Sequence, residues 1–242
     1  MNYRIDKYLS TALPLTRQEA KQALRKKEVQ VNGKVVTKPE IKINPEVDEV
    51  HFRNDPVVYE PYVYYMLHKP QGVVSATKDN VYPTVLDLIQ DDIHTDLFPV
   101  GRLDVDTEGL LLITNDGKLG HDLTSPGKHV DKTYEVKVDG ALTQAHIIQM
   151  REGLDIGDEK PTLPAELTIL KSSETESFAR ITIREGRFHQ VKRMFQALGL
   201  HVLYLKRIQM GTLVLDESLP KGDYRRLTKE EVANLCVRNI KQ

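Results

Sequence analysis

Hydrophobic residues recur along the first part of the chain with the spacing of helices. In residues 5–13 the apolar positions lie three or four apart, which predicts an amphipathic helix. A second helix is expected after Thr16, because Glu19 stands three residues later in a capping-box pattern. The segment VQVNGKVV then alternates around Asn32 and Gly33, which tolerate the positive φ angles of a tight hairpin turn. Two helices followed by a hairpin are therefore expected in this region.

Beyond residue 60 the pattern changes to short apolar runs separated by turn residues. The runs have the length and the β-branched and aromatic content of strands. They read YVYYMLHKP, GLLLIT, KTYEVKV, ELTILK, FARITI, HVLYLKRI and GTLVL. Helical stretches are sparser, and the clearest are residues 83–89, 144–150 and 188–199. This order predicts an α+β fold in which a few helices pack on a mixed, mainly antiparallel sheet.

A polar stretch separates the two patterns. Residues 53–60, RNDPVVYE, include charged residues and a proline and are expected to be a linker. The predicted organisation is a small domain over residues 1–52 and a larger domain over residues 61–242. The 242 residues suffice for one medium domain with a small companion.

Composition narrows the class of protein. With 40% hydrophobic and 29% charged residues, the chain suits a soluble globular fold. The longest aliphatic run, Leu110 to Ile113, is far too short to cross a bilayer, and the first ten residues lack the apolar core of a signal peptide. A single cysteine, Cys236, allows no intrachain disulfide. A cytoplasmic protein without membrane contact is expected, and nothing demands more than a monomer.

Charge is unevenly distributed although the net charge is only −1. Residues 1–52 carry 10 Lys and Arg against 7 Asp and Glu, and residues 180–207 carry 7 against 1. Two basic regions in a neutral chain are typical of a local nucleic-acid footprint, although uneven scatter produces the same numbers. On the second predicted helix one face carries three basic residues, which fits either phosphate contacts or a solvated surface. They are Arg17, Lys21 and Arg25.

The stretch GRLDVDTEGLLLITNDG places two aspartates before a buried run. A metal site would need further oxygen ligands, which are not nearby, and the 8 histidines lack the paired spacing of zinc ligands. Asp106 precedes Thr-Glu-Gly and fits turn chemistry. Asp104 leads into a packed strand, where a carboxylate must find a cation or take up a proton.

Residues 188–199 supply possible cations. Their apolar positions form one face of a helix that is expected to end at Gly199. His189, Lys192 and Arg193 share another face near the start of this helix, where acidic residues are usually preferred. Basic residues there suggest an anionic partner, either phosphate or Asp104, and an ordinary amphipathic helix with a basic solvent side remains the alternative.

Residues 1–52 resemble the S4-type RNA-binding domain. The resemblance rests on the RIDKYL opening, the TRQEAKQALRKKE helix and the VNGKVV hairpin. In that family the two helices present basic residues to structured RNA, which implies the same role for Arg17, Lys21 and Arg25.

The larger region resembles the ribosomal RNA pseudouridine synthases. HKPQGVVS, GRLDVDTEGLLLITNDG, KTYEV and EGRFHQVKRMF occur in the order of that family and look like its small-subunit (RsuA-type) branch. The resemblance implies that Asp104 is the catalytic aspartate, Tyr134 the active-site tyrosine and Lys192 the basic partner of the aspartate. It also implies an isomerase without a cofactor, because the reaction needs neither redox change nor energy input.

The implied substrate is one uridine of 16S ribosomal RNA, free or in a partly assembled small subunit. The uridine must leave its stack to expose the reacting atoms, and attack at C1′ or at C6 of the base is left open. Four basic residues are expected to contact RNA near the pocket, namely Arg102, Arg187, His189 and Arg193. The alternatives are a 23S ribosomal RNA synthase of a related branch, a catalytically silent assembly factor and a metal-dependent glycosyltransferase using Asp-x-Asp.

Overall fold

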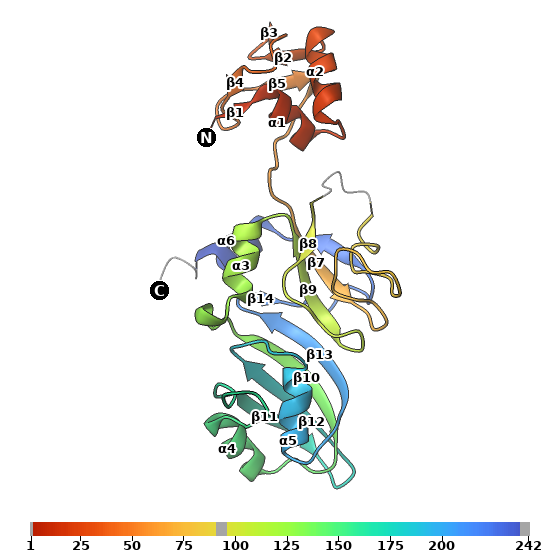
Figure 1. Cartoon of the computed structure of the whole chain (residues 1–242), viewed down its shortest axis with the longest axis vertical. Coiled ribbons are helices and arrows are strands. Elements are labelled where there is room, and N and C mark those ends of the chain that lie inside the picture. The colour runs from red at the N-terminus through yellow and green to blue at the C-terminus, as the bar shows by residue number, and fades with distance from the viewer. Residues whose placement is uncertain (1, 91–95, 238–242) are drawn as a thin grey trace. The chain divides into compact units, whose positions relative to one another are not determined.

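A computed structural model describes residues 2–90 and 96–237. Contacts divide these residues into two compact units, one of residues 2–63 and one of residues 64–90 and 96–237 (Figure 1). Met1 and the last five residues, which the predicted domains include, lie outside the described residues, as does the segment 91–95. No helix of the described part is long and apolar enough to span a membrane.

The first unit has the two helices that the apolar spacing predicts, α1 (Ile5–Ala12) and α2 (Arg17–Arg25). The capping box at the start of α2 is confirmed: the Glu19 N–H donates to Thr16 Oγ1 at 3.2 Å, and the Thr16 N–H donates to Glu19 Oε2 at 2.7 Å. These bonds satisfy donors that a helix start otherwise leaves unpaired.

The predicted hairpin is also confirmed. Asn32 and Gly33, with φ of 51° and 73°, join β2 (Val29–Val31) to β3 (Lys34–Val35). The sheet of this unit has the order β3-β2-β5-β6, and a separate pair joins β1 to β4. The remaining strands of the unit are β1 (Tyr3–Arg4), β4 (Lys42–Ile43), β5 (Val50–Phe52) and β6 (Asp55–Pro56).

Residues 53–60, expected to be a linker, take part in the packing of the first unit. Strand β6 pairs with β5, and Val57 is buried in the core of this unit. The Tyr8 hydroxyl donates to the Val57 carbonyl at 2.9 Å, and the Tyr59 ring stacks on Tyr8 with centroids 4.7 Å apart. These contacts belong to the first unit, and the domain boundaries at residues 52 and 61 stay a prediction.

The second unit is built on a mixed sheet of order β11-β12-β10-β13-β9-β7-β15, with β14 on β13 and β8 on β9 (Figure 1). Every pairing is antiparallel except that of β13 with β9. The predicted α+β class and the mixed, mainly antiparallel sheet are thus confirmed. The strands are β7 (Tyr64–Lys69), β8 (Phe98–Pro99), β9 (Glu108–Thr114), β10 (Lys132–Asp139), β11 (Glu166–Ser172), β12 (Glu176–Ile183), β13 (Val202–Met210), β14 (Leu213–Val214) and β15 (Tyr224–Arg226).

Two of the three helices predicted in this region form, and one does not. They are α4 (Gln144–Glu152) and α5 (Gln190–Ala197), which is followed by Gly199 at φ 77°. Residues 83–89 form turns instead, because the Val85 N–H donates to the Val74 carbonyl at 3.0 Å and ties this segment to another part of the chain. A tertiary contact here overrides a weak helical pattern.

Two further helices were not predicted, α3 (Gly117–Thr124) and α6 (Lys229–Val237). At α3 the turn residues before the helix act as its cap, since Asp116 Oδ1 accepts from the N–H groups of Lys118 and Leu119, both at 3.1 Å. A short 3-10 helix, η1 (Pro126–Lys128), follows α3.

The parallel pairing of β13 with β9 requires a glycine. Gly109 has φ of 106°, and a Cβ atom at this position would overlap the backbone carbonyl of Arg207. The strand that follows Asp104 can therefore approach β13 only without a side chain at this position.

We expect Gly109→Ala to destabilise the second unit by about 3 kcal/mol, through backbone strain and collision with Arg207. Gly199→Ala is the control, because Gly199 also has positive φ but nothing lies within 4 Å of a Cβ there. The control should cost only about 1 kcal/mol in the free energy of unfolding measured with urea. Equal costs would show that the close approach is not what Gly109 provides.

Candidate active site

Asp104 stands in a tight turn immediately before β9. The Thr107 N–H donates to the Asp104 carbonyl at 3.1 Å, which closes the turn and puts Asp106 at its third position. The Gly72 N–H donates to the Val105 carbonyl at 2.8 Å from a neighbouring loop. Asp106 thus lies in turn geometry, as its sequence context predicts.

A buried lysine, Lys69, stabilises this turn through hydrogen bonds to backbone carbonyls. The Nζ of Lys69 donates to the carbonyls of Asp104, Thr107 and Pro70, each at 3.0 Å. Burial lowers the pKa of Lys69 to about 8, although nearby acids, Asp104 first among them, act in the opposite direction. Sequence reasoning missed this residue, and the only indication was a lysine at the end of an apolar strand.

Ser75 holds the residue before Asp104. Its hydroxyl donates to the Leu103 carbonyl at 2.9 Å and accepts from the Leu103 N–H at 3.0 Å. Because Ser75 and Leu103 are both buried, this reciprocal pair fixes the backbone that carries the carboxylate.

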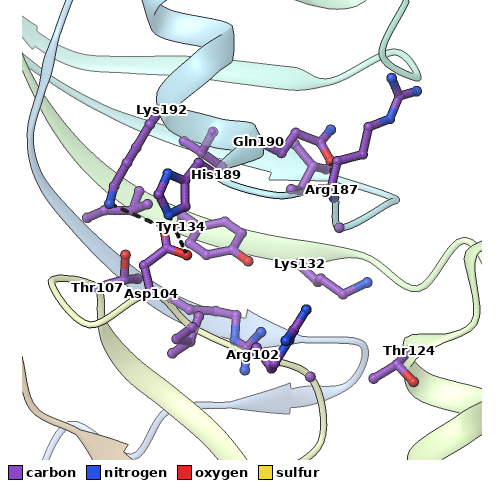
Figure 2. Close-up of a pocket in the computed structure, with 17 residues that line it drawn as sticks. Arg102, Asp104, Thr107, Thr124, Lys132, Tyr134, Arg187, His189, Gln190 and Lys192 are labelled. Carbon is purple, nitrogen blue, oxygen red and sulfur yellow. Dashed lines mark hydrogen bonds and ion pairs between the residues drawn. The ribbon is translucent and has the colours of Figure 1, made fainter. Parts of the chain in front are cut away.

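The predicted partner of Asp104 is where the sequence suggests. Lys192 Nζ lies 3.2 Å from Asp104 Oδ2 (Figure 2). It also lies 2.5 Å from Asp106 Oδ1, so that one ammonium binds both carboxylates. Burial acts to lower the pKa of Lys192, but the pairing with Asp106 and Asp104 outweighs it and raises the pKa. The pKa of Asp106 is lowered, because the bond from Lys192 outweighs the effect of burial.

Helix α5 presents Lys192 and His189 on the same side. His189 is the N-cap residue of α5, with φ of 48° and no side-chain capping bond, and its Nε2 lies 3.6 Å from Asp104 Oδ1. Val191, Met194 and Phe195 are buried on the other side of α5 and hold the helix in place. The helix therefore delivers two basic groups to one carboxylate.

Tyr134 lies on the floor of the same pocket. It is 8% exposed, stands on β10, and lines a pocket together with Asp104, His189 and Lys192 (Figure 2). The cavity volume is about 120 Å³, and its walls also include Ile183. The three residues implied as catalytic are thus brought together in one pocket.

The predicted RNA-contacting arginines near the pocket are placed differently from one another. Arg102 is exposed and lines the pocket. Arg187 also lines it, but its guanidinium donates to Glu185 at 3.0 Å and to the Pro161 carbonyl at 2.8 Å. Arg193 is not among the lining residues, because its guanidinium binds Asp158 at 2.5 Å and neighbouring carbonyls.

Sequence reasoning also missed two residues that line the pocket and one that stacks on its His189. Lys132 and Arg207 line it from β10 and β13, and both are buried. Phe188 is 74% exposed and stacks on His189 with ring centroids 3.8 Å apart.

The predicted basic face of α2 is present in the first unit. Arg17, Lys21 and Arg25 are all exposed, while Ala20 and Leu24 on the other side of the helix are buried. Within the described residues, no group of three or more His, Cys, Asp or Glu side chains could hold a metal ion. The two carboxylates of the Asp-x-Asp segment are bound by Lys192 instead.

Known protein families match both units of this chain. Residues 63–197 match the sequence profile of the family described as RNA pseudouridylate synthase, and residues 4–48 match the S4 domain. A solved structure described as a pseudouridylate synthase is 41% identical, covers 96% of this chain and 99% of its own, and superposes with a TM-score of 0.68.

Relatives of similar length extend the likeness over nearly the whole chain. An uncharacterized RNA pseudouridine synthase of Bacillus subtilis is 41% identical over 95% of this chain and 96% of its own. The ribosomal small subunit pseudouridine synthase A of Haemophilus influenzae is 41% identical over 96% and 99%, and that of Escherichia coli K12 is 40% identical over the same shares. By fold, pocket and sequence, the chain belongs to the RNA pseudouridine synthase family and carries an S4 domain at its N-terminal end.

Proposed function

We propose that the chain converts one uridine of 16S ribosomal RNA to pseudouridine, with Asp104 as the catalytic carboxylate. The observation that carries this proposal is the pocket in which Asp104, Tyr134 and Lys192 meet. The names of the relatives from Haemophilus influenzae and Escherichia coli support the small ribosomal subunit as the substrate. The proposal includes that the protein acts as a monomer in the cytoplasm.

The reaction rearranges bonds within a single nucleotide. The bond from N1 to C1′ breaks, the base turns over, and C5 bonds to C1′. The hydrogen on C5 leaves as a proton and N1 gains one, so that the composition is unchanged and neither oxidant nor energy source is needed. A carboxylate suits the first step, because carboxylates assist the cleavage of glycosidic bonds.

Lys192 keeps the carboxylate in place for this step. It donates to Asp104 and Asp106 together, which fixes the position of the ammonium and leaves Asp104 Oδ1 on the side of His189. Orientation of the reacting group lowers the barrier, because less freedom remains to be lost in the transition state.

Tyr134 offers an aromatic ring inside the pocket, and Phe188 offers one outside it, beside His189. Tyr134 is buried within the pocket, where its ring can stack on a flipped uracil and its hydroxyl can help to remove the C5 proton. Phe188 is exposed beside His189, where its ring can stack on a neighbouring base of the RNA. Arg102 and His189 are the remaining candidates for contacts at the pocket.

The proposal is tested by mapping pseudouridine after incubation with the wild-type protein. The substrates are free 16S ribosomal RNA, the same RNA in a partly assembled small subunit, and 23S ribosomal RNA. We expect one new site in a 16S substrate and none in 23S RNA. A site in 23S RNA alone would assign the chain to a large-subunit branch, and no site in any substrate would favour a silent assembly factor.

The basic face of α2 generates a separate prediction. We expect Lys21→Glu to weaken binding to the RNA substrate and to lower the salt slope of the affinity by about 1, because one phosphate contact is lost. Turnover at saturating RNA should survive, since Lys21 stands on the S4 domain rather than among the pocket residues.

Lys171→Glu makes the same change of charge on the exposed strand β11 and is the matched control. Filter-binding titrations at several salt concentrations measure both variants. Identical affinities for Lys21→Glu and wild type would rule out the phosphate contact.

A further inference from the structure

Two cationic side chains lie on the sheet face that forms the pocket floor. Lys132 stands two residues before Tyr134 on β10, and Arg207 lies opposite Tyr134 on the neighbouring strand β13. Residues two apart on a strand, and residues directly opposite one another, point to the same face of a sheet. Lys132, Tyr134 and Arg207 therefore share one face, and all three line the pocket.

Both cations are buried and neither has an anionic partner among the described residues. Lys132 is 9% exposed, and its Nζ donates to the Val130 carbonyl at 3.0 Å. Arg207 is 2% exposed, and its Nε donates to the Leu110 carbonyl at 2.8 Å. The Nη2 atom of Arg207 is buried and has no hydrogen-bond partner.

The other cations at this site are satisfied in a different way. Lys192 binds two carboxylates, and Lys69 donates to three carbonyls within 3.0 Å. By contrast, Lys132 and Arg207 repel one another: burial first, and then the charge of Arg207, lower the pKa of Lys132 to about 8. Asp131 is the acid that acts in the opposite direction.

Two unneutralised cations in a pocket cost free energy unless an anion joins them. The hydroxyl Oγ1 of Thr107, which also lines the pocket, is a second buried polar atom without a hydrogen-bond partner. In the view of Figure 2, the ring of Tyr134 lies between Asp104 and Lys132. A nucleotide whose base lies at Tyr134 would therefore extend from Asp104 towards the cations.

We propose that Lys132 and Arg207 form an anion subsite that binds a phosphate group of the flipped uridine nucleotide. The proposal rests on the proposed function, because that function supplies the nucleotide. The subsite anchors the nucleotide at its backbone while Asp104 acts on the uridine. It also gives the phosphate a partner in the pocket after the nucleotide leaves the RNA stack.

The subsite is tested by NMR titration of the full chain with labelled methyl groups. Ile183 and Leu205 line the same pocket and report on binding there. The probes are uridine 5′-monophosphate, uridine 3′-monophosphate, uridine and inorganic phosphate. We expect at least one monophosphate to bind more tightly than uridine, and the tighter one identifies which phosphate occupies the subsite.

Lys132→Met removes the charge but keeps the length of the side chain. We expect it to weaken binding of the preferred monophosphate roughly tenfold or more and to leave uridine binding unchanged. Lys132→Arg keeps the charge and should retain the preference for the monophosphate, which separates loss of charge from damage to the fold. Lys137→Met is the control on the same strand, because Lys137 pairs with Glu176 at 2.6 Å and does not line the pocket.

Proton uptake provides a second readout. Because the free Lys132 has a pKa of about 8, it is largely neutral at pH 8.5, and a bound phosphate favours its charged form. Calorimetry in two buffers of different ionisation enthalpy should show greater proton uptake on binding by wild type than by Lys132→Met.

Unchanged monophosphate binding in a folded Lys132→Met would overturn the subsite, as would equal affinities of wild type for uridine and both monophosphates. If wild type still modifies ribosomal RNA in either case, the proposed function stands and only the subsite fails. If the monophosphate binds through Lys132 but no RNA is modified, the subsite stands and the proposed function fails.

Discussion

The ammonium of Lys192 binds two carboxylates of the same turn, and the position of Asp104 in the pocket depends on this contact. Lys192 lies 3.2 Å from Asp104 and 2.5 Å from Asp106, so that both acids are paired with the same cation. The two acids differ in what surrounds them: the side chain of Asp104 is 26% exposed and lines the pocket, and that of Asp106 is 68% exposed. The contact therefore combines a structural acid with one that can reach a substrate.

The turn that carries both acids is held by hydrogen bonds to buried backbone groups and by close packing of two strands. Lys69 donates to the carbonyls of Asp104 and Thr107, while Ser75 holds the preceding residue through reciprocal hydrogen bonds. The glycine at position 109 lets β9 run parallel to β13, which brings the strand of Arg207 beside the aspartate turn. A cation, a hydroxyl and a missing side chain thus place one carboxylate at the start of an interior strand of the sheet.

Much of this arrangement could be predicted from the sequence, because local patterns and motif order carry it. The capping box and the hairpin follow from nearby residues, and the pairing of Asp104 with Lys192 follows from the family motifs. Lys132 and Arg207 could not be predicted, since long cationic side chains are normally exposed and their burial depends on which strands become neighbours. Arg193 was expected at the pocket, but an acid from a distant loop, Asp158, holds it elsewhere.

The most direct test compares Asp104→Asn with Asp106→Asn in single-turnover formation of pseudouridine on the RNA that wild type modifies. Each substitution removes one carboxylate charge from the same lysine, so the two variants differ mainly in which acid remains. We expect no product from Asp104→Asn. Asp106→Asn should stay within about tenfold of the wild-type rate, because an exposed ion pair contributes only about 1 kcal/mol. Equal losses in both variants, or activity in Asp104→Asn, would contradict the assignment of Asp104 as the catalytic carboxylate.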